Sequence, residues 1–118
     1  MPSEDPIRRF EDILENIIRI EEFTAGMDSA AFVKDLKTSD ATERCLQRIS
    51  EAAQKLGRVA EDLCPGVAWP SIRALGNILR HEYDMIDIAR VWLMVEDDLP
   101  SLKTAVQLAL KQLRESTD

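Results

Sequence analysis

The sequence has few of the side chains that most often bind metals or perform catalysis. It contains one histidine, one tyrosine and two cysteines, and aromatic residues make up only 5% of the chain. The two thiols, Cys45 and Cys64, lie far apart, and together with a single histidine they form a poor ligand set for zinc. We therefore expect no metal site, no cofactor, and two reduced, partly buried thiols.

Long apolar runs are also missing. No stretch approaches the roughly 20 apolar residues that a membrane-spanning helix requires. The first ten residues, MPSEDPIRRF, carry early acidic residues and lack the apolar segment of a secretory signal. These features predict a cytoplasmic protein with no membrane association.

Basic residues are outnumbered, because 22 acidic residues face 15 Lys and Arg, which gives a formal net charge of −7. This balance disfavours non-specific binding to nucleic acid, which needs a positive field. The acids are unevenly spread, however, since none occurs from Leu63 to His81. Two interpretations are open: part of this window is buried or packed against a partner, or the window accommodates an anion.

What the sequence does contain is helical periodicity in one domain spanning residues 1–118. Apolar residues recur at spacings of three and four, and there is no strand-like alternation between hairpin turns. The fold class we predict is all-α, an up-and-down bundle of four long helices with one or two short ones. The expected helices cover residues 6–26, 28–36, 40–63, 70–83, 88–99 and 100–113.

The helix expected at 70–83 carries the rarest residues, within the stretch LGNILRHEYDMID. A helical register gathers its polar side chains on one side and turns Tyr83 elsewhere; the gathered residues are Arg73, Asn77, Arg80 and His81. Gly76 is placed mid-helix, where glycine costs about 1 kcal/mol relative to alanine. Such a glycine indicates close approach by another backbone or a ligand, from a neighbouring helix or a second subunit.

Each of these residues also has a purely structural interpretation. A lone histidine is more often structural than catalytic, exposed arginines contribute little, and a tyrosine hydroxyl often binds a backbone carbonyl in the core. Their occurrence on one helix, inside the window without acids, makes a functional site a stronger hypothesis than any of them would alone.

Two stretches, GNILRHEYDMID and VWLMVEDDLPSL, resemble the signature region of HepT-like proteins in the HEPN superfamily. The resemblance extends to the N-terminal IRRFEDILENIIRIEEFT segment and to ERCLQRISEAAQKLG. It implies a HEPN-type bundle that forms homodimers, with the motif helices of two subunits beside a shared cleft. It further implies a metal-independent ribonuclease toxin acting on RNA, neutralised by a minimal nucleotidyltransferase that transfers AMP to the motif tyrosine.

Position by position, Asn77, His81 and Tyr83 match the family pattern, whereas Gly76 stands where that pattern more often has arginine. Glycine has no side-chain donor for a phosphate, so Arg73 and Arg80 become the candidates for that role. The resemblance thus implies catalytic roles for His81, Asn77 and Arg80, substrate binding by Arg73 and Arg80, and AMP attachment at Tyr83.

Three functional hypotheses follow. The first is the endoribonuclease toxin, with a composite site at the dimer interface. The second is a non-catalytic helical subunit that docks a nucleotidyltransferase and carries a degenerate nuclease motif, which the glycine and the negative charge favour. The third is a helical dimer whose motif serves only structure. The sequence does not indicate which RNA would be cleaved.

Overall fold

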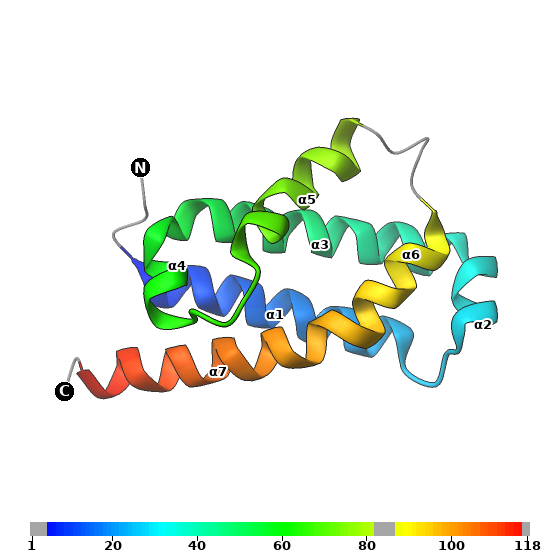
Figure 1. Ribbon diagram of the computed structural model, residues 1–118. Helices are drawn as coiled ribbons and strands as arrows, with labels where there is room; N and C mark the ends of the chain where they lie inside the picture. The colour runs from blue at the N-terminus through cyan, green and yellow to red at the C-terminus, as the bar shows by residue number, and fades with distance from the viewer. Residues whose placement is uncertain (1–4, 82–86, 117–118) are drawn as a thin grey trace.

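The computed structural model describes residues 5–81 and 87–116, and of Arg80 and His81 only the backbone. Its helices follow one another as shown in Figure 1: α1 (Pro6–Thr24), α2 (Ser29–Lys34), α3 (Leu36–Leu56), α4 (Arg58–Leu63), α5 (Trp69–His81), α6 (Ile88–Leu93), the π-helical turn η2 (Met94–Asp98) and α7 (Leu99–Ser116). The prediction of an all-α bundle with four long helices is confirmed, since α1, α3, α5 and α7 are long and the described ranges contain no strand.

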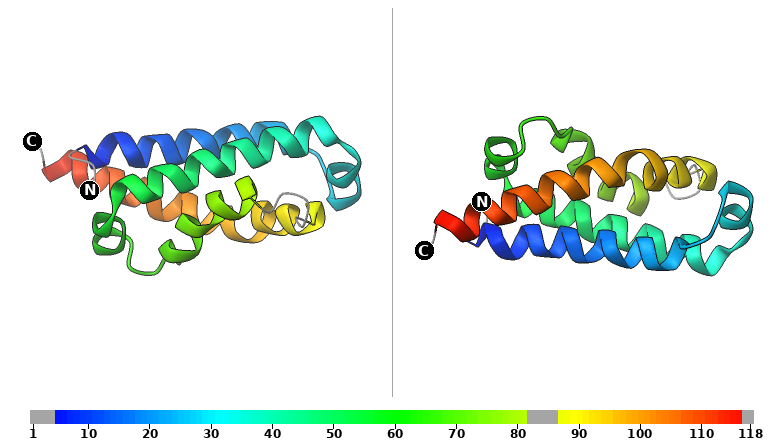
Figure 2. Two further views of the ribbon diagram at one scale, coloured as in Figure 1. Left: turned by 90° about the horizontal axis from the view of Figure 1, so that it is seen from above. Right: turned by 90° about the horizontal axis from the view of Figure 1, so that it is seen from below.

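The long helices pack side by side. α1 and α3 run in opposite directions along most of the molecule, α7 lies along α1, and α5 packs on α3 (Figures 1 and 2). α6 leads into α7 on the side opposite the chain termini (Figure 1). In the part of the chain that the structure describes, no helix combines the length and hydrophobicity needed to cross a membrane.

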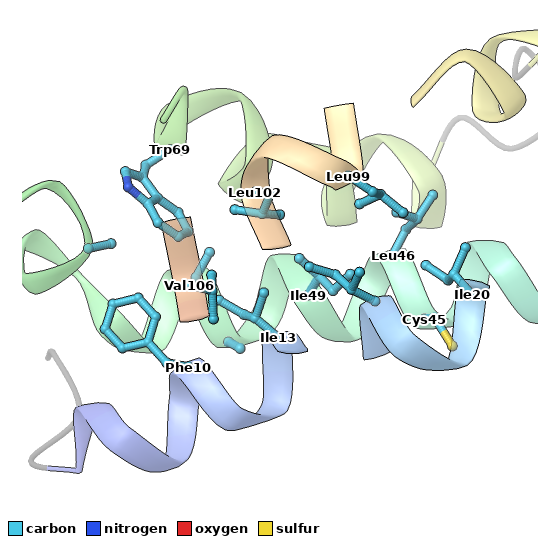
Figure 3. Packing of buried hydrophobic residues seen from close by; sticks show 14 of the residues in the cluster. Phe10, Ile13, Ile20, Cys45, Leu46, Ile49, Trp69, Leu99, Leu102 and Val106 are labelled. Atoms are coloured by element: carbon cyan, nitrogen blue, oxygen red, sulfur yellow. The ribbon is translucent and has the colours of Figure 1, made fainter. Parts of the chain in front are cut away.

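The core lies where α1, α3 and α7 meet, and the start of α5 covers it (Figure 3). The fully buried Phe10 of α1 contacts Trp69 of α5 edge to face, with ring centroids 6.4 Å apart. Ile13, Ile49 and Val106 fill the centre from the three long helices. Burying side chains of this size stabilises the fold by roughly 1.5–3 kcal/mol each, so the core fixes where α5 begins.

The first helix begins as predicted, because the Asp5 carboxylate accepts the Arg8 N–H at 3.1 Å and Pro6 occupies the first helical position. The predicted helix 40–63 was wrong at both ends. α3 begins earlier, where Asp35 accepts the Thr38 N–H at 3.0 Å. It ends at Leu56, because Gly57 adopts φ 58°, and the short α4 follows.

The last helix, α7, begins one residue before the predicted start at Pro100. It is not separated from the preceding helix as predicted, since α6, η2 and α7 follow one another with helical backbone at Leu99. Proline inside a helix clashes with the carbonyl of the residue four positions earlier. Here the wide π-helical turn brings the Leu99 N–H to the Met94 carbonyl, five positions back, just before Pro100. That wider spacing lets the helix continue through the proline.

Candidate functional site

The start of α5 is held in place by Trp69. Its indole Nε1 donates to the Cys64 carbonyl at 3.0 Å, and the ring is fully buried. The main chain enters the helix through the Ala68 carbonyl, which accepts the N–H groups of Ser71 and Ile72. Leu79, 5% exposed, buries the other end of the helix in the core. The helix that carries the motif is therefore attached by large apolar side chains near both of its ends.

Arg73 faces α3 and α4 instead of forming a free cation on α5. Its Nε donates to the Ala53 carbonyl at 3.3 Å, and one terminal nitrogen donates to the Gly57 carbonyl at 2.8 Å. The same guanidinium forms a two-pronged ion pair with Glu61, in which Nη1 lies 2.9 Å from Oε2 and Nη2 contacts Oε1. Arg73 thus connects α5 to two carbonyls at the C-terminal end of α3, and the Gly57 carbonyl also accepts the Ala60 N–H at 3.2 Å.

This ion pair alters the ionisation of both partners. The hydrogen bond from Arg73 holds the pKa of the Glu61 carboxyl below its ordinary value, and the same bond raises the pKa of Arg73. Both groups are therefore charged at neutral pH. A phosphate that bound Arg73 would have to displace an acidic partner already in bidentate contact.

Gly76 is buried against α3, as its mid-helix position had suggested. Its N–H donates to the hydroxyl of Ser50 at 2.9 Å. The same hydroxyl donates to the Arg73 carbonyl at 3.0 Å, and Gln54 Nε2 donates to that carbonyl at 3.0 Å. The element that approaches Gly76 is thus a neighbouring helix of the same chain.

On the opposite side of α5, the residues whose side chains the structure describes are exposed and uncharged. Ala74, Asn77 and Ile78 lie there, and Ile78 is 43% exposed. Asn77 therefore presents its amide to the surface, unlike Arg73, although the two share a stripe on a helical projection. We call Ala74, Asn77 and Ile78 the outward face of α5.

The remaining motif residues lie at or beyond the end of this helix. The backbones of Arg80 and His81 are helical, and His81 ends α5 four positions after Asn77. The side chains of Arg80 and His81 and all of Tyr83 lie outside the described residues. The roles assigned to these residues and to Asn77 stay predictions.

The window without acids borders an apolar groove of about 770 Å³ between α5 and the η2–α7 segment, over α3. Nine residues of the window line it; they are Leu63, Cys64, Pro65, Gly66, Val67, Ala68, Ser71, Ile72 and Leu75. The one charged lining residue among the described positions is Asp98. For this part of the window, the absence of acids accompanies apolar surface and not a cluster of cations.

Both cysteines are free and buried, as expected. Burial raises the pKa of each thiol, and Cys64 Sγ donates to the Ala105 carbonyl at 3.5 Å. A raised pKa leaves little thiolate at neutral pH, so neither cysteine has the environment of a reactive nucleophile.

Comparison with known proteins adds an independent observation to this geometry. The family model described as "Ribonuclease HepT-like" matches residues 13–109. The chain belongs to the HepT-like ribonuclease family. The match begins in α1 and ends in α7, so it includes all of α5 and the resemblance drawn from its motif is confirmed.

Individual relatives align over most of their length. "Probable ribonuclease HepT" of Thermococcus cleftensis is 37% identical over 93 residues, which cover 79% of this chain and 84% of that protein. "Putative RNase MJ1380" of Methanocaldococcus jannaschii is 33% identical over 97 residues, covering 82% and 89%. A comparison with solved structures found no match.

Sequence reasoning did not find Ser50, Gln54 and Glu61, the side chains that bind α5 in this HepT-like chain. All three lie on α3 or α4, where a polar residue on an amphipathic helix is ordinarily assigned to solvent. The available signal was Gly76, which indicated close approach without identifying the approaching element.

Proposed function

We propose that this chain is a HepT-like toxin, a metal-independent endoribonuclease whose active site forms where two copies of α5 meet. The observation that carries the proposal is the HepT-like match across the motif, in a helix that exposes Asn77 and ends at His81. Residues four apart lie on the same side of an α-helix, so the backbone register puts both motif positions on one side. The relatives named as ribonucleases support the same activity.

The homodimer is supported by surface chemistry. The outward face of α5 carries no charge, although charged residues make up 31% of the chain. Small and apolar side chains let two helices approach closely without burying an unpaired charge between them. A two-fold contact through this face would bring both Asn77–His81 turns beside one cleft.

Cleavage of RNA without a metal needs a base for the 2′-hydroxyl, an acid for the leaving 5′-oxygen, and a cation near the phosphate. Histidine serves as base or acid because its ordinary pKa lies near neutrality. Each chain supplies one histidine, so a pair of imidazoles would require both subunits. Asn77 would orient the phosphate or His81, and Arg80 would stabilise the negative charge of the transition state.

Arg73 is the weaker candidate for phosphate binding, because its guanidinium is already bound to Glu61 and to carbonyls of α3. That arrangement, with Gly76 buried, leaves Arg80 as the motif cation best suited to the role. The engagement of Arg73 and the burial of Gly76 also favour the second function, a non-catalytic subunit that docks a nucleotidyltransferase. The two functions differ in whether RNA is cleaved.

His81→Ala is the test of the first function. Removal of a general acid–base catalyst costs on the order of 10²–10⁴ in rate, so RNA cleavage and growth inhibition should vanish while the helical circular dichroism and the dimer mass persist. Undiminished cleavage by this variant would reject the proposed site. A wild-type chain that cleaves no RNA would favour the docking function instead.

We also propose that a cognate minimal nucleotidyltransferase neutralises the toxin by transferring AMP to Tyr83. Because Tyr83 is the only tyrosine, intact-mass spectrometry after co-expression gives a clean test. AMP adducts should appear on the wild-type chain and be absent from Tyr83→Phe, with His81→Ala as a control that keeps the tyrosine. Adducts that persist in Tyr83→Phe would contradict this assignment.

A further inference from the structure

Ser50 occupies an unusual place for a serine in the middle of a helix. It is fully buried on α3, and its hydroxyl contacts α5 instead of its own helix. The hydroxyl donates to the Arg73 carbonyl at 3.0 Å and accepts the Gly76 N–H at 2.9 Å. These two backbone groups lie three residues apart, so one side chain of α3 bridges adjacent turns of α5.

Gln54, one turn further along α3, adds a second donor to the Arg73 carbonyl at 3.0 Å. In the reverse direction, the Arg73 side chain donates to the Ala53 and Gly57 carbonyls of α3 and its end. Donors therefore pass both ways between the helices within a short segment. Such a set resists both sliding and rotation of α5 on α3, which a purely apolar contact resists less.

A side chain that enters the hydrogen-bond ladder of a helix changes the direction of the following turn. Here the entry point is Gly76, and the following turn contains Asn77 and ends at His81. Figure 1 shows α5 leaning away from α3 towards its C-terminal end. The contact with Ser50 thus lies directly before the site-bearing turn.

We infer that Ser50 is a positioning residue for the proposed site: its hydroxyl, inserted between Arg73 and Gly76, aims the Asn77–His81 turn. The inference rests on the proposed function for its catalytic meaning, whereas its structural content does not need RNA cleavage. Gln54 supports the same carbonyl and contributes less, because it is exposed and a solvent molecule can replace its amide.

The test compares Ser50→Ala with Ser39→Ala in the full chain. Ser39 is a matched control, since it is also buried on α3 and its hydroxyl also donates to a backbone carbonyl, that of Leu36 at 3.1 Å. Its bond is local to α3, whereas the bond of Ser50 reaches α5. Both variants lose one buried hydroxyl, and only one loses the bridge.

Three measurements are made on each variant. Amide hydrogen exchange at residues 77–81 should accelerate about tenfold in Ser50→Ala, the size expected for one buried hydrogen bond, and should change little in Ser39→Ala. The imidazole resonance of His81, the only histidine, should shift its titration midpoint in Ser50→Ala alone. In RNA cleavage, kcat should fall about tenfold with KM retained, because misaimed groups lose transition-state contacts.

Gln54→Met provides a second, gentler variant. It removes one donor to the Arg73 carbonyl at an exposed position, so folding should be preserved. Exchange at residues 77–81 should accelerate about threefold, which is less than for Ser50→Ala and follows from replacement of the amide by water. Equal or larger acceleration than in Ser50→Ala would assign the positioning to Gln54 and overturn the role of Ser50.

The outcomes separate this inference from the proposed function. If exchange and the His81 resonance are unchanged in Ser50→Ala, or if they change equally in Ser39→Ala, the positioning role is overturned. If they change as expected and the wild-type chain cleaves no RNA, the positioning role stands and the nuclease proposal fails. A fall in kcat confined to Ser50→Ala, with the exchange pattern above, supports both.

Discussion

The two sides of α5 differ in almost every physical property. Towards α3, backbone and side chain groups of Arg73 and Gly76 are engaged by Ser50, Gln54 and Glu61. On the outward face, Ala74, Asn77 and Ile78 are exposed and uncharged. One side is held by polar contacts within the chain, whereas the three residues of the outward face are exposed to solvent.

This difference shows how two residues on one stripe of a helical projection can have different surroundings. Arg73 and Asn77 are four residues apart, which puts their Cα atoms on one side of the helix. The arginine side chain is long enough to turn back to Gly57 and Glu61, whereas asparagine is short and stays where its Cα directs it. An arginine is a suitable residue type for binding phosphate, but a side chain of this length can instead reach structural partners within its own chain.

Gly76→Arg is the change expected to have the largest effect. It restores the residue more common in the family pattern, but at a buried position beside Ser50. Burying an unpaired guanidinium and displacing α3 should lower the free energy of unfolding by about 3 kcal/mol or more. Urea unfolding followed by circular dichroism measures the loss.

Gly66→Arg is the matched control for that experiment. Gly66 is exposed, and a Cβ added there meets nothing within 4 Å, so the same substitution should change stability by less than about 0.5 kcal/mol. A Gly76→Arg protein that was as stable as wild type and cleaved RNA faster would contradict the assignment of Gly76 to the structural side of α5. Position 76 would then belong to the site.

Arg73→Met should have the next largest effect. Methionine keeps the apolar stem but removes the guanidinium that donates to the Ala53 and Gly57 carbonyls and to the Glu61 carboxylate. Loss of these hydrogen bonds should cost about 1–3 kcal/mol in the free energy of unfolding. Chemical unfolding of the purified variant gives the value.

The control is Arg19→Met on α1, which breaks an exposed pair with Glu15 whose N–O distance is 2.8 Å. Exposed pairs one helical turn apart contribute about 0.3–0.5 kcal/mol, so this variant should remain close to wild type. Equal losses in Arg73→Met and Arg19→Met would show that Arg73 is not a structural residue, which would return it to the phosphate-binding candidates.

The sequence was sufficient for the fold class and for the helix that carries the motif, because apolar spacing and the Asp5–Pro6 start are local signals. It was insufficient where distant residues decide the outcome. One contact that holds α5 on α3 joins Gly57 to Arg73, sixteen positions later, whose guanidinium donates to the Gly57 carbonyl. The periodicity within either segment does not predict that contact. It does not predict the contact between Ser50 and Gly76 either.

The smallest expected effect concerns the pH dependence of the Arg73–Glu61 pair. The hydrogen bond from Arg73 keeps the pKa of folded Glu61 below its ordinary value of 4.5. A carboxyl with a lowered folded pKa contributes stability that is present above its unfolded pKa and is lost as pH falls through the folded one. The unfolding midpoints of wild type and Glu61→Gln should therefore differ at about pH 7 and converge at about pH 2.

The control is the exposed Glu15→Gln, whose unfolding midpoint should differ little from that of wild type at either pH. A gap that widened in acid would mean that the carboxylate opposes folding, and Arg73 would then help to attach α5 through its carbonyl contacts and not through Glu61.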